Sequence, residues 1–75
     1  MKATYENNGE YSFIYLNLKS EKEVNKAMAI TKVLESYGCY ELSHYDNEVF
    51  MIANTEADQT IESMKEDYRA AKKAV

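Results

Sequence analysis

A strand, a helix cap and a helix follow one another almost without a loop between Tyr11 and Gly38, and this stretch constrains the fold more than any other. Aromatic and branched side chains occupy both faces of the segment 11–18, which is typical of a central strand that is covered on both sides. Ser20 and Glu23 form a capping box, in which the serine hydroxyl accepts the amide proton of residue 23 and the Glu23 carboxylate reaches back to the amide of Ser20. Apolar residues then recur every three or four positions, so we predict a helix that ends at Gly38.

A hairpin signal precedes this unit. Asn8 and Gly9 separate an alternating segment, residues 2–6, from the first predicted strand, and Asn-Gly is typical of a two-residue hairpin loop. With this loop, Thr4 lies opposite Phe13. A loop longer by one residue would turn the side chains of the segment 2–6 to the other face of the sheet.

A second hairpin signal follows the helix. Asp46 and Asn47 separate two further segments, residues 39–45 and 48–54, that are rich in strand-forming side chains. A loop of two or four residues gives the same pairing of faces here, because the side-chain period of a strand is two.

A last helix is predicted to begin after Asn54 or Thr55, either of which can cap it. Its buried stripe is expected to contain Ala57, Ile61, Met64, Tyr68, Ala71 and Val75. Asp58, Glu62 and Glu66 lie one turn apart on its outer side. Such a row can imitate nucleic-acid phosphates in a basic groove, or it is a solvated helix face whose charge nearby lysine and arginine side chains neutralise.

The element order is therefore ββαββα in one small domain that spans residues 1–75. We predict an α+β two-layer sandwich, with a four-stranded antiparallel sheet and both helices on one face of it. Strands 10–18 and 48–54 occupy the middle of this sheet, and strands 2–6 and 39–45 form its edges. The arrangement is a permuted form of the ferredoxin-like fold.

The composition restricts the partners that the chain can have. A formal charge of -4 and a pI of about 4.9 disfavour non-specific binding to nucleic acid or to anionic membranes. Cys39 is the only cysteine, so no internal disulfide is possible. The chain has neither an apolar run of about 20 residues nor an apolar signal segment. We therefore expect a cytoplasmic protein, in its own cell or in a host cell that a phage has infected.

Alternation along the strands sorts the side chains into two faces. The face toward the helices is expected to carry Ala3, Tyr5, Ile14, Leu16, Leu18, Leu42, Val49 and Met51. The uncovered face is expected to carry Tyr11, Phe13, Tyr15, Phe50 and Ile52, with Tyr45 at its polar rim. An apolar, aromatic centre with a polar rim is typical of a protein interface, formed with another protein or in a homodimer. The alternative is that the last helix, a longer loop or the N-terminal residues cover this face.

No catalytic motif emerges from the remaining polar residues. His44 has no second histidine or suitably placed cysteine with which to share a metal, and turn chemistry explains Asp46-Asn47-Glu48. The two glycines cannot build a phosphate-binding loop. We therefore predict no catalytic residue, no metal and no cofactor. Since Lys2 is the only basic residue expected near the aromatic face, we do not expect direct nucleic-acid binding either.

The region from Tyr11 to about Tyr68 resembles the compact ferredoxin-like nucleases of CRISPR adaptation and a related family of antitoxin ribonucleases. The shared features are a strand that ends in YLNL, a helix that ends in LESYG, a hairpin and a helix that begins at a threonine. The resemblance implies the ferredoxin-like fold. In the adaptation nucleases a metal-binding aspartate commonly stands near the end of the first strand, where this chain has Asn17, a poor ligand for a hard cation.

Size, acidity and the aromatic face together indicate a non-enzymatic interaction protein. We expect an inhibitor or regulator of a protein that handles nucleic acid, for example a phage protein of the anti-CRISPR or anti-restriction kind. The candidate partner-binding residues are Tyr11, Phe13, Tyr15, Tyr45, Phe50, Ile52, Glu62 and Glu66. A metal-dependent ribonuclease of the ferredoxin-like type and a dimeric ligand-sensing module are the alternatives.

Overall fold

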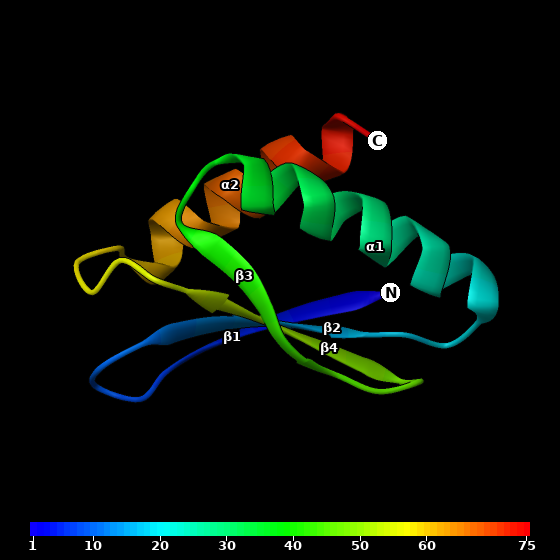
Figure 1. Ribbon diagram of the computed structural model, residues 1–75, viewed down its shortest axis with the longest axis horizontal. Helices are drawn as coiled ribbons and strands as arrows, with labels where there is room; N and C mark the ends of the chain where they lie inside the picture. Colours follow the sequence, from blue (N-terminus) through cyan, green and yellow to red (C-terminus); the bar gives the residue numbers. More distant parts are fainter.

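Two β-hairpins, each followed by a helix, make up the chain. A computed structural model describes residues 1–75. Its elements are β1 (Lys2–Asn7), β2 (Ser12–Asn17), α1 (Glu21–Ser36), β3 (Tyr40–Tyr45), β4 (Val49–Asn54) and α2 (Ile61–Lys73). The strands form one antiparallel sheet in the order β1-β2-β4-β3, and both helices lie on the same face of it (Figure 1). The predicted α+β fold, its ββαββα order and its sheet topology are thus confirmed.

The first hairpin forms with a shifted turn. Its central residues are Gly9 and Glu10, since the Asn8 N–H donates to the Tyr11 carbonyl oxygen at 3.1 Å. Gly9 has a φ of 95°, and glycine at the first central position is typical of a type II′ turn. Thr4 therefore lies opposite Tyr15, two residues beyond the predicted pairing. The faces are unchanged, because a shift of two keeps each side chain on its side of the sheet.

Helix α1 begins and ends where the sequence predicts. The Ser20 hydroxyl oxygen accepts the Glu23 N–H at 3.3 Å. The Glu23 carboxylate accepts the Lys19 N–H at 2.7 Å, rather than the predicted Ser20 N–H, and also pairs with the N-terminal ammonium of Met1. At the other end Gly38 has a φ of 91°, the left-handed conformation that glycine adopts without a Cβ clash.

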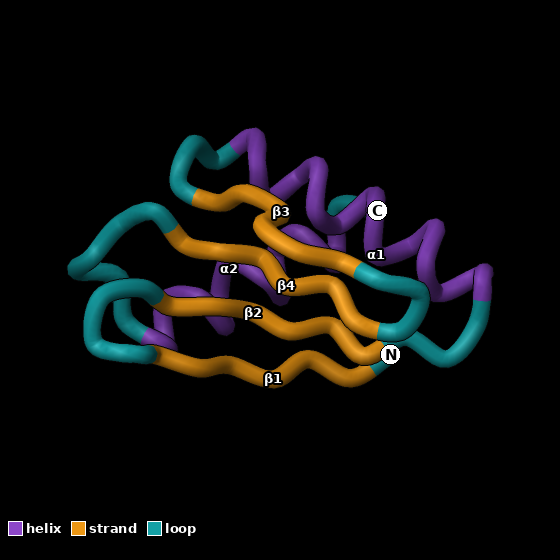
Figure 2. Tube along the Cα trace, turned by 60° about the horizontal axis from the view of Figure 1, so that its bottom comes forward, coloured by secondary structure: helices purple, strands orange, loops and turns teal.

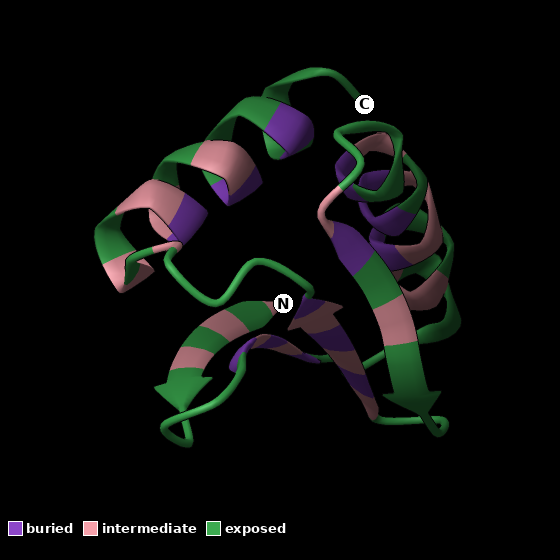
Figure 3. Cartoon of the chain, turned by 60° about the vertical axis from the view of Figure 1, so that its left-hand side comes forward, coloured by how far each residue is buried: buried purple, intermediate pink, exposed green.

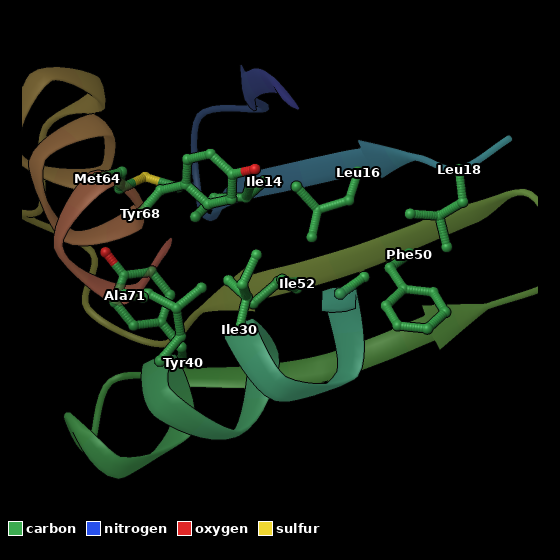
Figure 4. Close-up of a cluster of buried hydrophobic side chains, with 12 residues drawn as sticks. Ile14, Leu16, Leu18, Ile30, Tyr40, Phe50, Ile52, Met64, Tyr68 and Ala71 are labelled. Carbon is green, nitrogen blue, oxygen red and sulfur yellow. The ribbon is translucent and has the colours of Figure 1, made fainter. Parts of the chain in front are cut away.

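The hydrophobic core lies between the sheet and the two helices (Figure 4). Ile14 lies opposite Ile52 and Leu16 opposite Phe50, and all four side chains are fully buried. The helices complete this core with Ala27, Ile30 and Leu34 from α1 and with Met64, Tyr68 and Ala71 from α2. Seen end-on, β2 and β4 show alternating bands of buried and half-buried residues (Figure 3).

The face predicted for the β4 side chains is wrong. Phe50 and Ile52 point toward the helices, whereas Val49 and Met51 lie on the uncovered face with Phe13 and Tyr15. Both sets of β4 side chains are apolar, so alternation alone does not distinguish them. The pairing with β2 decides the outcome, because Phe50 and Ile52 complete the core that Leu16 and Ile14 begin.

A bulge in β3 explains why part of the second hairpin followed the prediction. Near the turn, Tyr45 lies opposite Phe50 and His44 opposite Met51, as expected. The register then shifts between Leu42 and His44, which leaves Ser43 as an extra residue. The Ser43 hydroxyl donates to the Met51 carbonyl oxygen at 3.2 Å. Beyond the bulge Leu42 lies opposite Ile52, so it still faces the helices as predicted.

Helix α2 begins later than predicted. Its N-cap is Thr60, whose hydroxyl oxygen accepts the Ser63 N–H at 3.1 Å, rather than Asn54 or Thr55. Residues 55–60 form a connection, which the Asn54 side chain supports by accepting the Glu56 N–H at 2.6 Å. Ala57 and Asp58 lie in this connection and do not belong to the helix. Of the predicted buried stripe, Met64, Tyr68 and Ala71 are buried, Ile61 is half-buried, and Ala57 and Val75 are exposed.

Candidate functional site

The uncovered side of the sheet, which we call the open face, carries a group of apolar side chains. The strands lie in front of both helices when the molecule is seen from this side (Figure 2). The apolar residues of the open face are Phe13, Tyr15, Val49, Met51 and Ala53. Each is half-buried, and none packs against the hydrophobic core. Their burial therefore comes from one another and from neighbouring strands, and water reaches their outer surfaces.

The two aromatic rings at the centre of the open face come from β2. The ring centroids of Phe13 and Tyr15 are 6.1 Å apart, and the ring planes are tilted by 43°. Phe13 lies opposite Ala53 and Tyr15 opposite Met51, so small and flexible side chains flank the rings. Methionine adapts its shape readily and is common at binding surfaces that accept irregular partners.

Polar side chains border this apolar centre. Lys2, Thr4 and Glu6 lie along β1, while Glu41 and His44 lie along β3, and all five are exposed. Burial raises the pKa of the Tyr15 phenol above its usual value, and the adjacent Glu6 carboxylate raises it further. The phenol is therefore a neutral hydrogen-bond donor at physiological pH.

A shallow hollow lies at one end of the open face. Its lining is formed by Tyr11, Phe13, Glu41, Ala53, Asn54 and Thr55. The Tyr11 side chain is 51% exposed. An exposed ring beside a hollow gives a partner side chain a place to insert, which is how aromatic anchors act in protein interfaces.

The structure brings together three of the predicted partner-binding residues and separates three others from them. Tyr11, Phe13 and Tyr15 lie on the open face, whereas Phe50 and Ile52 are fully buried beneath the helices. The assignment of Phe50 and Ile52 to the binding surface is therefore wrong, and Met51 and Ala53 occupy the place predicted for them. Tyr45 is 56% exposed but lies on the helix side of the sheet. Its ring contacts that of Phe50 edge-to-face, with 4.8 Å between centroids.

The predicted acidic row on the last helix is shorter than expected. Asp58 lies outside α2, which leaves Glu62 and Glu66 on the exposed side of the helix. The Lys65 Nζ atom lies 3.7 Å from a carboxylate oxygen of Glu62. This pairing partly neutralises the acidic surface that remains.

A cluster of basic side chains, which the sequence reasoning missed, forms where the two helices meet. The two helices run in opposite directions (Figure 1), and side chains of both helices line a common hollow. Lys22, Lys26 and Lys72 line one hollow there, while Lys65, Arg69 and Lys72 line a neighbouring one. The basic end of the last helix is visible in the sequence. Its position beside the lysines of α1 follows only from the packing of the helices.

Lysine side chains cover the aromatic rings near this cluster. The Lys65 Nζ atom lies 5.7 Å from the centroid of the Tyr5 ring, and the Lys72 Nζ atom lies 5.4 Å from that of Tyr68. Cation–π attraction holds both cations at the surface of the protein. The two rings are therefore occupied by the chain's own side chains, unlike Phe13 and Tyr15 on the open face.

The residues considered for chemistry lie apart from one another. Asn17 ends β2, and Asp46 lies in the turn between β3 and β4. The Asp46 carboxylate accepts the N–H groups of Glu48 and Val49 at 2.7 and 2.8 Å, and these bonds lower its pKa. No three histidine, cysteine, aspartate or glutamate side chains come close enough together to hold a metal ion. Asp46 thus has the role in turn formation that its sequence context predicts.

Comparison of the chain with protein families, with characterised proteins and with solved structures finds no significant match. Neither α1 nor α2 has the length and apolar composition required to cross a bilayer. The open face is the surface on which apolar side chains gather outside the core.

Proposed function

We propose that this protein is a non-enzymatic interaction module that binds another protein through its open face. The observation that carries the proposal is the position of Phe13, Tyr15 and Met51. All three are large, lie side by side on neighbouring strands and remain outside the core. Their contact with water costs free energy, which a partner surface can recover by covering them.

The chemistry of the open face favours protein over nucleic acid as the partner. Aromatic residues and methionine are enriched in the centres of protein interfaces, and a polar rim surrounds them here. Lys2 is the one cation on this rim, and two carboxylates, Glu6 and Glu41, accompany it. A nucleic-acid backbone would meet repulsion from both carboxylates and little compensating attraction.

We further propose that the partner is a protein that handles nucleic acid and that this chain inhibits or regulates it. The support is the formal charge of -4 on a small chain. Proteins that bind nucleic acid present basic surfaces, and an acidic protein is steered toward such a surface. Glu41 at the rim, together with Glu62 and Glu66 on α2, contributes to that charge. Inhibition of a CRISPR or restriction enzyme is the version of this function to test first.

Affinity capture tests the proposal directly. The tagged protein is incubated with a lysate of cells that contain it, or with purified CRISPR and restriction enzymes, and bound proteins are identified by mass spectrometry. Phe13→Lys places a charge at the centre of the open face and should abolish specific capture. Tyr37→Lys is the matched control, since Tyr37 is an exposed aromatic residue at the end of α1, away from the sheet.

One control and two outcomes make the capture experiment decisive. Circular dichroism must show that both variants remain folded at the temperature of the assay. Capture that survives Phe13→Lys in the folded protein would contradict a role for the open face. Loss of capture with Tyr37→Lys alone would move the binding surface to the helix side.

A further inference from the structure

The sheet ends in two edge strands, β1 and β3, and only β1 has an unprotected edge. β3 contains the bulge at Ser43, which disturbs a regular hydrogen-bonding edge. β1 is regular over its whole length and contains no proline. It is the outermost strand on its side of the sheet (Figure 2). Regular, uncovered edges of this kind readily pair with another strand.

The pattern of the first hairpin shows which backbone groups are free on β1. The Asn8 N–H bonds to the Tyr11 carbonyl oxygen, so the backbone groups of Lys2, Thr4 and Glu6 point toward β2. Those of Ala3 and Tyr5 consequently point outward. Neither residue makes a backbone hydrogen bond to any turn, loop or cap of the chain.

We infer that β1 pairs with β1 of a second copy of this chain, antiparallel and about a two-fold axis through Thr4. In this register Ala3 of one copy pairs with Tyr5 of the other, which satisfies the outward N–H and C=O groups of both. Lys2 of each copy then lies opposite Glu6 of the other. These opposite charges form non-hydrogen-bonded pairs, the positions at which side chains on adjacent strands come closest.

Charge complementarity selects this register among the neighbouring ones. A shift of two residues in either direction keeps the outward groups paired but removes Glu6 from its position opposite Lys2. A parallel pairing would set strand ends of like charge side by side. Two oppositely charged pairs per dimer therefore favour the antiparallel arrangement centred on Thr4.

In the same arrangement, the α2 helices of the two copies have complementary charges. It contacts β1, and Lys65 reaches the Tyr5 ring from the side of α2 that lies above the sheet edge. Glu62, Lys65 and Arg69 lie three or four residues apart along the helix and so share this side. A two-fold axis through β1 brings the α2 helices of the two copies together in opposite directions. The acidic Glu62 of one copy then approaches the basic Arg69 of the other.

The dimer has a consequence for the binding surface. Pairing of the two β1 strands joins the two four-stranded sheets into one, with the helices of both copies on the same side. The open faces become one continuous surface, and Lys2, Thr4 and Glu6 lie at its centre. The inference is independent of the proposed function, since the dimer uses the edge of the sheet and leaves Phe13, Tyr15 and Met51 free.

Charge exchange tests the dimer. Sedimentation equilibrium over a range of concentrations should give a dimer for the wild type, and Lys2→Glu or Glu6→Lys should raise its dissociation constant by about tenfold or more, because the two-fold axis doubles each repulsion. The double variant, Lys2→Glu with Glu6→Lys, restores opposite charges and should recover most of the affinity. Glu6→Lys also removes a contact with Tyr15, which the double variant does not restore.

Two further variants separate the edge from the open face. Ala3→Pro removes an outward N–H and should give a folded monomer, since that group has no partner within the chain. Met51→Lys changes the open face two strands away from β1 and should leave the dimer intact while it weakens partner capture. A wild type that remains monomeric at high micromolar concentration would overturn the inference. So would a dimer that Met51→Lys dissociates and the charge reversals do not affect.

Discussion

At the scale of single residues, the Gln59 side chain stands out. It lies in the connection before α2 and forms hydrogen bonds with side chains of β3, β4 and α2. Its amide nitrogen donates to the Tyr40 hydroxyl at 2.8 Å and to the Asp67 carboxylate at 2.7 Å. Its amide oxygen accepts a hydrogen bond from the buried Asn54 side chain. The Tyr40 hydroxyl in turn donates to Asp67 at 2.6 Å. Buried networks in which every polar atom is paired fix one arrangement of the chain.

Removal of the Tyr40 hydroxyl should destabilise the fold. Tyr40→Phe removes one acceptor of the Gln59 amide and one donor to the Asp67 carboxylate, and a lost buried hydrogen bond costs about 1–3 kcal/mol. Tyr37→Phe is the matched control, because Tyr37 is exposed and should change stability by less than about 0.5 kcal/mol. Urea unfolding measures both. Equal stabilities of the two variants would mean that the network contributes nothing.

Because of Tyr40, the fold should lose stability at alkaline pH. Burial, together with the hydrogen bond to the Asp67 carboxylate, raises the pKa of Tyr40 far above its ordinary value. The folded chain therefore keeps the phenolic proton that the unfolded chain releases near pH ~10. The stability that the protonated Tyr40 hydroxyl contributes is fully present below that pH and is lost as the pH rises above it. The urea midpoint should fall less between pH ~8 and ~11 in Tyr40→Phe than in the wild type.

Cys39 should react slowly with alkylating reagents. Burial raises the pKa of its thiol, and the Glu56 and Asp67 carboxylates raise it further, so little thiolate is present at neutral pH. We expect iodoacetamide to modify the native protein several-fold more slowly than the protein unfolded in urea at the same pH. Equal rates would indicate that neither burial nor the two carboxylates affect the reactivity of the thiol.

At the scale of elements, the largest difference between the predicted and the observed boundaries is the N-cap of α2. Thr55 and Thr60 both precede the apolar stripe of the last helix, and each can cap a helix. The Asn54–Gln59 hydrogen bond and the Glu56 N–H bonded to Asn54 hold residues 55–59 in a compact connection. The helix can begin only after this connection. Tertiary contacts of Gln59, which no local pattern contains, therefore decide between the two threonines.

Alanine substitutions at the two threonines test this assignment. Thr60→Ala removes the acceptor of the Ser63 N–H and should cost about 1 kcal/mol of stability. Thr55→Ala removes an exposed side chain and should cost less than about 0.5 kcal/mol. Urea unfolding of both variants gives the comparison. The opposite order of stabilities would place the start of the helix at Thr55.

The elements themselves were largely predictable, and the faces of one strand were not. Turn residues, the Ser20 cap and the position of Gly38 define most boundaries locally, so both hairpins and α1 form in the expected segments, with the first turn shifted by one residue. In β4 both sets of alternating side chains are apolar. The bulge at Ser43 carries no signal in the sequence, because serine is common in regular strands as well. The open face was therefore predicted correctly for β2 and incorrectly for β4.

Alanine substitutions of Phe50 and Phe13 test which of the two rings faces the core. Phe50→Ala should cost about 3–5 kcal/mol, because the ring is fully buried in the core. Phe13→Ala should cost much less, since one side of its ring already meets water. Thermal unfolding distinguishes the two outcomes. A larger loss for Phe13→Ala would restore the original assignment of faces.

At the scale of the whole molecule, the surface divides into regions of different character. The open face is apolar at its centre, the junction of the two helices is basic, and the remaining surface carries the acidic excess. The helices account for burial on their side of the sheet, and no element covers the other side (Figure 3). This division is the basis of our proposal that a partner binds the open face.

Hydroxyl-radical footprinting of the protein, free and bound to its captured partner, shows directly which surface the partner covers. We expect Phe13, Tyr15 and Met51 to lose most of their reactivity in the complex, because the partner covers the open face. Tyr37 and Tyr45, which lie elsewhere, should react as they do in the free protein. Protection of the helix side, with Met51 as reactive as before, would show that the partner does not bind the open face.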